Sequence, residues 1–331
     1  MSSEKNDKLN LEDSSVTETT GQTRKSLDSI RPTESDKRSV HPKSDPPEII
    51  QVPGYTFIES LNPDRSKKRS IIYCAMKEDT RKVVVVKQYP EEERSQYEQE
   101  KAIQGILKEK GGYKHLLLAN QFIDENRVII TDFMGGGDLR QLLKIFKEKK
   151  VMLNPYQAQG LVAGSCKGLQ RMHDCNIIHR DVKEGNMFLD AANFDLDEIT
   201  PERLKAGITT LKFSDYGISW HESVPRHSEP GRIAGTIYYL APEIISGGKP
   251  DPRSDIYALG IVYFKMFTGE FPFKSDVFRQ QQEAPLPDMT KLNTTISKDL
   301  QHIVETMLEK DPDKRYQTAT NVRKAYFQHL R

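Results

Sequence analysis

Hydrophobic and polar positions follow two different patterns along the chain, and the change falls near residue 135. Before it, short runs rich in β-branched and aromatic residues alternate with charged breaks, a pattern typical of strands joined by hairpins. Predicted strands occupy 55–58, 70–75, 82–87, 116–118 and 128–131. Residues 91–110 instead place apolar side chains at helical spacing among many charges, which predicts one amphipathic helix. The run Val83-Val-Val-Val86 predicts a strand buried on both faces.

Helical patterns dominate after Gly135-Gly-Gly137. Predicted helices occupy 138–149, 155–174, 254–268, 297–309 and 318–330. Residues 254–268 are apolar almost all round, so this helix is expected to be buried. The pattern therefore predicts an α+β fold, with a small β-rich part that holds one helix and a larger, mainly helical part.

Residues 1–50 have a different composition from the rest of the chain. They contain no Phe, Trp or Tyr and are rich in Ser, Thr and charged residues. Such a segment buries too little apolar surface to offset its backbone entropy. We expect a disordered tail here, followed by one ordered domain over 51–331.

Charge and cysteine content narrow the class of protein. Among 331 residues, 49 basic and 48 acidic side chains give a net charge of +1, which argues against a nucleic-acid or membrane-surface partner. No run approaches the roughly 18–20 apolar residues of a membrane span, and no apolar signal segment follows the N-terminus. Three scattered cysteines fit a reducing compartment, so an intracellular protein, cytoplasmic or nuclear, is expected. The oligomeric state stays open.

One short segment gathers side chains suited to phosphoryl transfer. His179-Arg-Asp181 is followed by Lys183 and Asn186, and Asp215 opens an Asp-Tyr-Gly triplet further along. Phosphoryl transfer needs a group that orients the attacking hydroxyl, a cation for the transferred phosphoryl group and oxygen ligands for Mg²⁺. A third motif, Ala241-Pro-Glu243, precedes the predicted buried helix.

These motifs, in this order and at these spacings, resemble those of eukaryotic-type protein kinases over about Tyr55 to Leu330. The segment from His179 to Asn186 resembles the catalytic loop, Asp-Tyr-Gly the metal-binding triplet and Ala-Pro-Glu the end of the activation segment. The resemblance implies a two-lobed kinase fold, with an N-lobe and hinge over 51–134 and a C-lobe over 135–331. It also implies ATP and Mg²⁺ as cofactors and proteins as substrates.

The resemblance implies roles at the reacting end of the site. Asp181 would orient the substrate hydroxyl and accept its proton, and Lys183 would contact the γ-phosphate. Asn186 and Asp215 would hold Mg²⁺. Thr236, resembling the threonine that bonds the catalytic aspartate, and Lys183 both favour serine/threonine specificity.

The resemblance also implies the nucleotide contacts. Lys87 would pair with the α- and β-phosphates and be held by Glu100 of the predicted helix, with Glu98 as the alternative. Positions that resemble the adenine and ribose contacts are Ile72, Val85 and Phe188 around the ring, Thr131 as gatekeeper, Asp132-Phe-Met134 as hinge, and Asp138 near the ribose.

Three further features concern the activation segment. Glu243 and Arg315 resemble a buried ion pair that anchors it, and Asp255 resembles the anchor of the catalytic loop. An upstream kinase that phosphorylates Ser223 or Ser228 would supply a phosphate for Arg180 to pair with. A loop ordered by packing alone is the alternative.

The sequence departs from the family at its glycine-rich loop. Arg65, Lys67 and Ser70 stand at the three glycine positions. Glycine there lets the backbone approach the phosphates closely. Either the basic side chains replace the backbone amides by charge, or this hairpin tip contributes little to nucleotide binding.

A second departure is an insertion in a hairpin, Asp190–Gly207, in which Thr200 is placed to cap a short helix. Three hypotheses about function follow. The first is an ATP- and Mg²⁺-dependent protein serine/threonine kinase. The second is a catalytically weak or inactive pseudokinase that acts as a protein-binding scaffold. The third is a small-molecule kinase, against which Thr236 and the Ala-Pro-Glu segment argue because they suit a peptide substrate.

Overall fold

The computed structural model describes residues 50–62, 70–111, 114–190, 199–205, 210–225 and 236–330. Residues from Ile50 onward form one compact unit. Among the described residues, no helix combines the length and the apolar character needed to cross a membrane. The predicted tail up to Ile49, the loop positions Arg65 and Lys67, and Ser228 lie outside the described residues.

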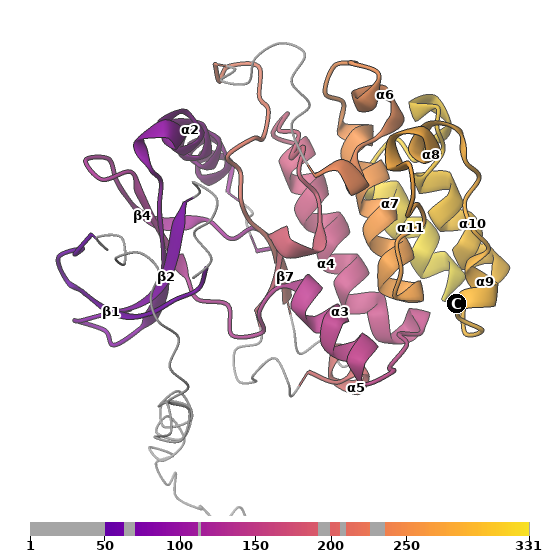
Figure 1. Cartoon of the computed structure of the whole chain (residues 1–331), viewed down its shortest axis with the longest axis horizontal. Helices are drawn as coiled ribbons and strands as arrows, with labels where there is room; N and C mark the ends of the chain where they lie inside the picture. The colour runs from indigo at the N-terminus through magenta and orange to yellow at the C-terminus, as the bar shows by residue number, and fades with distance from the viewer. Residues whose placement is uncertain are drawn as a thin grey trace, which may run out of the picture. The chain divides into compact units, whose positions relative to one another are not determined.

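An antiparallel sheet forms the smaller part of this unit (Figure 1). Its five strands among the described residues pair in the order β1-β2-β3-β5-β4. Its strands are β1 Tyr55–Ser60, β2 Ile71–Lys77, β3 Val83–Gln88, β4 Ala119–Ile123 and β5 Val128–Asp132. The prediction for the valine run is half right. Val84 and Val86 are buried, whereas Val83 and Val85 are half-buried because this face of β3 borders a cavity that Val85 lines.

The prediction of a strand at 116–118 is wrong. The strand begins at Ala119, and Leu116 forms only an isolated bridge with Phe213 of the other part of the unit. Leu116 and Leu117 are buried, and the backbone N–H of Leu117 donates to the carbonyl of Phe213 at 2.7 Å. The apolar run therefore marks a connection packed between the two parts of the unit, and not a strand of the sheet.

Within the described part of this lobe, one helix accompanies the sheet, as predicted. It consists of a 3₁₀ turn, η1 Glu91–Glu93, followed by α2 Arg94–Lys110. Tyr97 of α2 packs with Tyr89, Ala119 and Ile129 in a small apolar cluster. This packing fixes α2 against the sheet and so places its next turn, which carries Glu100.

The larger part is helical, and the five predicted helices are present: α3 Leu139–Glu148, α4 Pro155–His173, α7 Pro252–Thr268, α10 Lys298–Met307 and α11 Ala319–His329. Shorter helices and 3₁₀ turns join them: η2 Glu184–Asn186, α5 Pro201–Lys205, η4 Ile237–Tyr239, α6 Pro242–Ile245, α8 Val277–Glu283, α9 Met289–Leu292 and η5 Pro312–Lys314. Thr200 accepts from the backbone N–H of Arg203 at 3.3 Å, so the predicted cap of α5 is confirmed.

Helix α7 lies at the centre of this part, as its apolar sequence predicts. All residues from Asp255 to Thr268 except Lys265 are buried. At Gly260 an added Cβ would lie 2.9 Å from a side-chain atom of Leu308, so glycine permits close contact with the end of α10. A two-stranded sheet, β6 Met187–Asp190 and β7 Thr210–Phe213, completes the fold. The α+β prediction, with a small β-rich lobe and a larger helical lobe, is confirmed.

Candidate functional site

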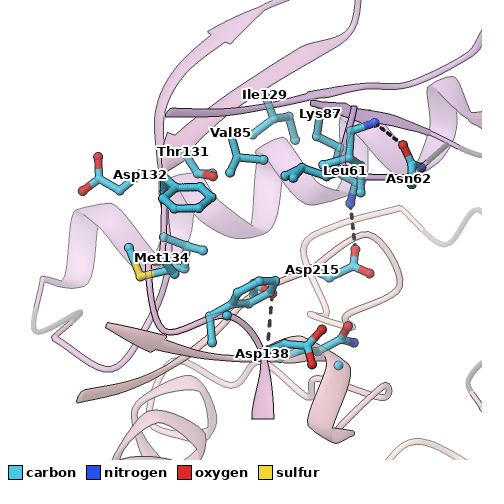
Figure 2. A pocket seen from close by; sticks show the side chains of 18 of the residues that line it. Leu61, Asn62, Val85, Lys87, Ile129, Thr131, Asp132, Met134, Asp138 and Asp215 are labelled. Carbon is cyan, nitrogen blue, oxygen red and sulfur yellow. Dashed lines mark hydrogen bonds and ion pairs between the residues drawn. The ribbon is translucent and has the colours of Figure 1, made fainter. Parts of the chain in front are cut away.

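A cavity of about 540 Å³ lies between the five-stranded sheet and the helical lobe (Figure 2). Small-molecule sites commonly measure about 300–1,000 Å³. Its apolar walls come from both lobes, since Ile72 and Val85 line it from the sheet and Phe188 lines it from β6. Thr131 of β5 and Met134, which follows that strand, also line the cavity. The residues predicted to surround an adenine ring therefore share one cavity.

Lys87 links the two lobes at the inner end of this cavity. Its Nζ lies 2.9 Å from Oδ1 of Asp215, a residue that follows β7 (Figure 2). The same Nζ lies 3.1 Å from Glu100 Oε2 of α2. The alternative partner, Glu98, is exposed on α2. Burial by itself would lower the pKa of Lys87, but the carboxylates of Asp215 and Glu100 raise this pKa well above its ordinary value. Lys87 in turn lowers the pKa of Asp215, so both groups are charged at neutral pH.

Tyr89 is a site residue that the sequence reasoning missed. Its hydroxyl donates to Glu100 Oε2, and Lys87 Nζ lies 4.6 Å from the centroid of its ring. Gln104 donates to the other oxygen of Glu100 at 3.1 Å. Glu100 is thus held by three side chains. The spacing along the chain could have indicated this role. Tyr89 follows Lys87 by two residues, and such residues project from the same side of an extended chain.

A second group of polar side chains surrounds Asp181 in the loop before β6. Lys183 Nζ lies 2.5 Å from Asp181 Oδ2, and Thr236 donates to Asp181 Oδ1 at 3.0 Å. Asn186 donates its amide to Asp181 Oδ2 at 2.9 Å and to the backbone carbonyl of Asp181 at 2.8 Å. The contact expected between Thr236 and Asp181 is therefore present, and both carboxylate oxygens have fixed positions.

Asp255 of α7 holds the backbone that leads into this loop. Its carboxylate accepts from the backbone N–H groups of His179 at 2.8 Å and Arg180 at 2.9 Å, and His173 Nε2 lies 2.9 Å from it. Arg180 has a φ of 67°, which is uncommon for a residue with a side chain. The buried carboxylate offsets this strain by fixing two successive N–H groups, as expected for an anchor of the loop.

Glu243 and Arg315 form the expected ion pair. Two guanidinium nitrogens of Arg315 lie 2.8 and 2.7 Å from the two oxygens of Glu243, and Ser254 donates to the same carboxylate at 2.7 Å. Burial would raise the pKa of Glu243, but its hydrogen bonds with Arg315 lower it overall. The Arg315 side chain is fully buried, so the pair fixes α6 to the segment before α11.

Two predicted nucleotide contacts already have partners within the protein. The carboxylate of Asp132 points away from Val85 and Lys87 in Figure 2. It accepts from Lys82 at 2.8 Å and from Asn120 at 2.7 Å. Asp138 caps α3, accepting from the backbone N–H of Gln141 at 2.8 Å. Both residues line the cavity, but the Asp132 side chain is directed outward.

The oxygen donors of Asn186 and Asp215 fit a hard divalent cation. Both residues line the cavity. Asn186 uses its Nδ2 toward Asp181, which leaves its Oδ1, and Asp215 uses Oδ1 toward Lys87, which leaves its Oδ2. No cluster of three or more His, Cys, Asp or Glu side chains suited to a metal occurs among the described residues. Such a two-ligand site is typical of Mg²⁺ that is also bound by phosphate oxygens and water.

The sequence reasoning also missed Asn62, which joins the two ends of the hairpin above the cavity. It accepts from the backbone N–H of Ile72 at 2.8 Å and donates to the carbonyl of Ser70 at 2.8 Å. Ser70 in turn donates through its hydroxyl to Glu93 of η1 at 2.7 Å. Ser70, at one of the three glycine positions, is thus tied both to Asn62 and to the turn that precedes α2.

Comparisons with known proteins agree with this geometry. The protein kinase domain model matches residues 68–327. The chain is 32% identical over 201 residues to the serine/threonine-protein kinase PknB of Mycobacterium leprae, covering 59% of this chain and 29% of that protein. Its identity to PknB of Mycobacterium tuberculosis is 31% over 202 residues, covering 59% and 29%. For the probable serine/threonine-protein kinase PknB of Corynebacterium glutamicum it is 29% over 204 residues, covering 59% and 28%. The chain spans less than a third of the length of these curated relatives.

Proposed function

Since the chain belongs to the protein kinase domain family, we propose that it transfers the γ-phosphate of ATP, bound with Mg²⁺, to serine and threonine hydroxyls of proteins. The single observation that carries this proposal is the convergence of Lys87, Asn186 and Asp215 in one cavity, with Asp181 bonded to Asn186. The names of the relatives support serine/threonine specificity. We place the kinase domain at 51–331, with the N-lobe and hinge over 51–134 and the C-lobe over 135–331.

The nucleotide would occupy the cavity between the lobes. Val85 and Phe188 would enclose the adenine ring, and Lys87, held by Glu100, would bind the α- and β-phosphates. Asn186 and Asp215 would hold Mg²⁺, which would supply positive charge beside the phosphates. Because Lys87 keeps its charge at neutral pH, it needs no proton transfer before it binds phosphate.

In the transfer itself, Asp181 orients the substrate hydroxyl and accepts its proton. A bond forms between the hydroxyl oxygen and the γ-phosphorus, and the bond from that phosphorus to the β,γ-bridging oxygen breaks. Lys183, 2.5 Å from Asp181, supplies a positive charge beside the transferred group. Thr236 holds the carboxylate through its second oxygen.

Phosphate transfer from radiolabelled ATP to a generic protein substrate tests this assignment. We expect Asp181→Asn to lower kcat by about 10²- to 10⁴-fold, the usual contribution of a positioned acid–base group. Asp174→Asn is the matched control, because Asp174 is exposed at the end of α4 and accepts only from Gln170 among the contacts of the described residues. Labelling that persists undiminished in Asp181→Asn would overturn the proposed role of Asp181.

A pseudokinase that acts as a protein-binding scaffold is the second candidate function. It is favoured by one observation, the presence of Arg65, Lys67 and Ser70 where the family has glycines. Side chains at these positions keep the backbone further from the phosphates. Absence of MgATP binding at millimolar concentration would favour the scaffold over the kinase.

We also propose an intracellular location, in the cytoplasm or nucleus. Cys74, Cys166 and Cys175 are free and buried, as is usual where thiols stay reduced. An upstream kinase is a further proposed partner. Its target would be Ser223, an exposed residue whose hydroxyl lies 2.8 Å from His221 Nδ1, or Ser228.

A further inference from the structure

Arg140 places a positive charge beside the loop that carries Asp181. It is the second residue of α3 and lines the mouth of the cavity, and 68% of its side chain is exposed. At Gly185 an added Cβ would lie 3.7 Å from the guanidinium carbon of Arg140. Gly185 is four residues after Asp181 in the same loop, so the guanidinium lies next to the path of a substrate that reaches Asp181.

The carboxylates on this side of the site have partners within the protein. Glu184 is only 1% exposed; Lys265 lies 2.7 Å from one of its oxygens, and Tyr239 donates to the other. Asp138 is buried and caps α3. Asp215, whose side chain is 44% exposed, also lines this cavity, but it is paired with Lys87. These three carboxylates are therefore engaged within the protein.

Arg140 retains capacity to bind an anion. The contact given by the described residues runs from its Nη2 to Asp138 Oδ2 at 3.0 Å, while a guanidinium carries five N–H donors. Lys144 and Lys147 follow at positions four and seven residues later, on the same exposed face of α3. Three exposed cations therefore follow one another along α3, and the second of them, Lys144, lies 3.8 Å from Glu148.

We propose that Arg140 selects protein substrates that carry an acidic side chain within a few residues of the acceptor hydroxyl. The acidic group is aspartate, glutamate or phosphoserine, each of which pairs with a guanidinium through charge-assisted hydrogen bonds. An extended substrate advances about 3.3–3.6 Å per residue, so a side chain near the acceptor passes Arg140. This inference rests on the proposed function, because it assigns the substrate class of the same site.

Peptide kinetics test the proposal. Each peptide has one acceptor serine, with glutamate, phosphoserine, glutamine or arginine placed near it on one side or the other. The value of kcat/KM is measured for each peptide. We expect the wild type to favour the glutamate or phosphoserine peptide over the glutamine peptide by about tenfold or more, the effect of one charge-assisted hydrogen bond. Comparing phosphoserine with glutamate identifies which acidic group is preferred.

Variants assign the preference to Arg140. The ratio of acidic to neutral kcat/KM should fall to about two or less in Arg140→Ala, persist in part in Arg140→Lys, and turn toward the arginine peptide in Arg140→Glu. Because both kcat/KM values in this ratio come from the same variant, a general loss of activity does not change the ratio. Lys291→Ala is the matched control, since Lys291 is 82% exposed on α9, and it should keep the wild-type ratio. Wild type without acidic preference, or Arg140→Glu with it intact, would overturn the proposal.

A binding measurement separates this proposal from the proposed function. Fluorescence anisotropy of the glutamate and phosphoserine peptides, with alanine at the acceptor position, requires no phosphate transfer. If the wild type binds the acidic peptides and Arg140→Glu does not, the proposal is supported even when no peptide is phosphorylated. In that case the proposed function alone fails. Equal binding of acidic and basic peptides by the wild type would contradict the proposal.

Discussion

Lys87 and Lys310 show how differently this fold treats two lysines. Lys87 lies between the carboxylates of Asp215 and Glu100, which raise its pKa despite its burial. Lys310 lies 4.5 Å from the ring centroid of Phe273, and burial together with the charge of Arg315 lowers its pKa to about 8. Lys87 is therefore held in the charged form, whereas Lys310 loses its proton at a lower pH than an ordinary lysine.

The environment of Lys310 predicts a pH dependence of stability. Because the pKa is about 8 in the folded chain and near 10.4 in the unfolded chain, the unfolded chain binds more protons between these values. The free energy of unfolding should therefore rise with pH in this window, by about 0.5 kcal/mol from pH 7 to pH 9 because solvent screens this partly exposed group. Lys310→Met should lack this rise, as measured by urea unfolding at the two pH values.

Lys314→Met provides the matched control, since Lys314 is exposed four residues away. It should retain the wild-type pH dependence. The same dependence in wild type and Lys310→Met would show that the unfolding of this domain does not depend on the protonation of Lys310.

At the scale of single residues, part of the site could be predicted from the sequence. Asp181, Lys183 and Asn186 lie within one short segment, so their types and spacing alone indicated phosphate chemistry. Tyr89 and Asn62 could not be assigned this way, because each acts on residues that only the folded chain brings near. Tyr89, just after β3, contacts Glu100 of α2, and Asn62 bonds Ser70 and Ile72 across a hairpin.

At the scale of elements, hydrophobic spacing predicted the long helices and four of the five strands. Hydrophobic spacing failed where buried residues lie outside a strand and where a strand is largely exposed. Residues 116–118 are apolar because they pack between the lobes, while the true edge strand, β4, exposes Asn120 and Gln121 and shows no alternation. Helices as short as α6, with four residues, carry too little pattern to be predicted.

The ion pair between Glu243 and Arg315 predicts how strongly α6 is fixed. In Glu243→Gln the Arg315 guanidinium stays buried with its charge unpaired, so the free energy of unfolding should fall by about 3 kcal/mol. Urea unfolding measures this loss. Glu283→Gln removes an exposed pair with Arg279 within α8 and should leave the free energy of unfolding almost unchanged. Similar small losses in both variants would show that burial does not strengthen the Glu243 pair.

At the scale of the whole described unit, the site depends on contacts between the sheet and the helical lobe. Lys87 of β3 bonds Asp215, which follows β7, and Gln99 of α2 donates to the backbone carbonyl of Ser219. The cavity has walls from both lobes. A ligand in it contacts both parts at once, so its binding should stabilise the folded unit as a whole.

Thermal unfolding with and without MgATP tests this expectation. At 100 times its dissociation constant, MgATP should stabilise the fold by about 2.7 kcal/mol and raise Tm by roughly 5 °C. Lys87→Met should remove most of this shift because the phosphates lose their cation. Lys77→Met, at a half-buried lysine that pairs with Asp79 and is not among the residues that line the cavity, should keep it. Equal shifts in both variants would place the nucleotide away from Lys87.

The most direct measurement of the central claim identifies the acceptor. The wild-type protein is incubated with MgATP and three peptides that differ only in having serine, threonine or tyrosine at one position, and mass spectrometry locates the phosphate. We expect phosphate on the serine and threonine peptides, little on the tyrosine peptide, and almost none on any peptide with Asp181→Asn. Three unmodified peptides under conditions where MgATP binds, or phosphate on tyrosine alone, would contradict a serine/threonine kinase.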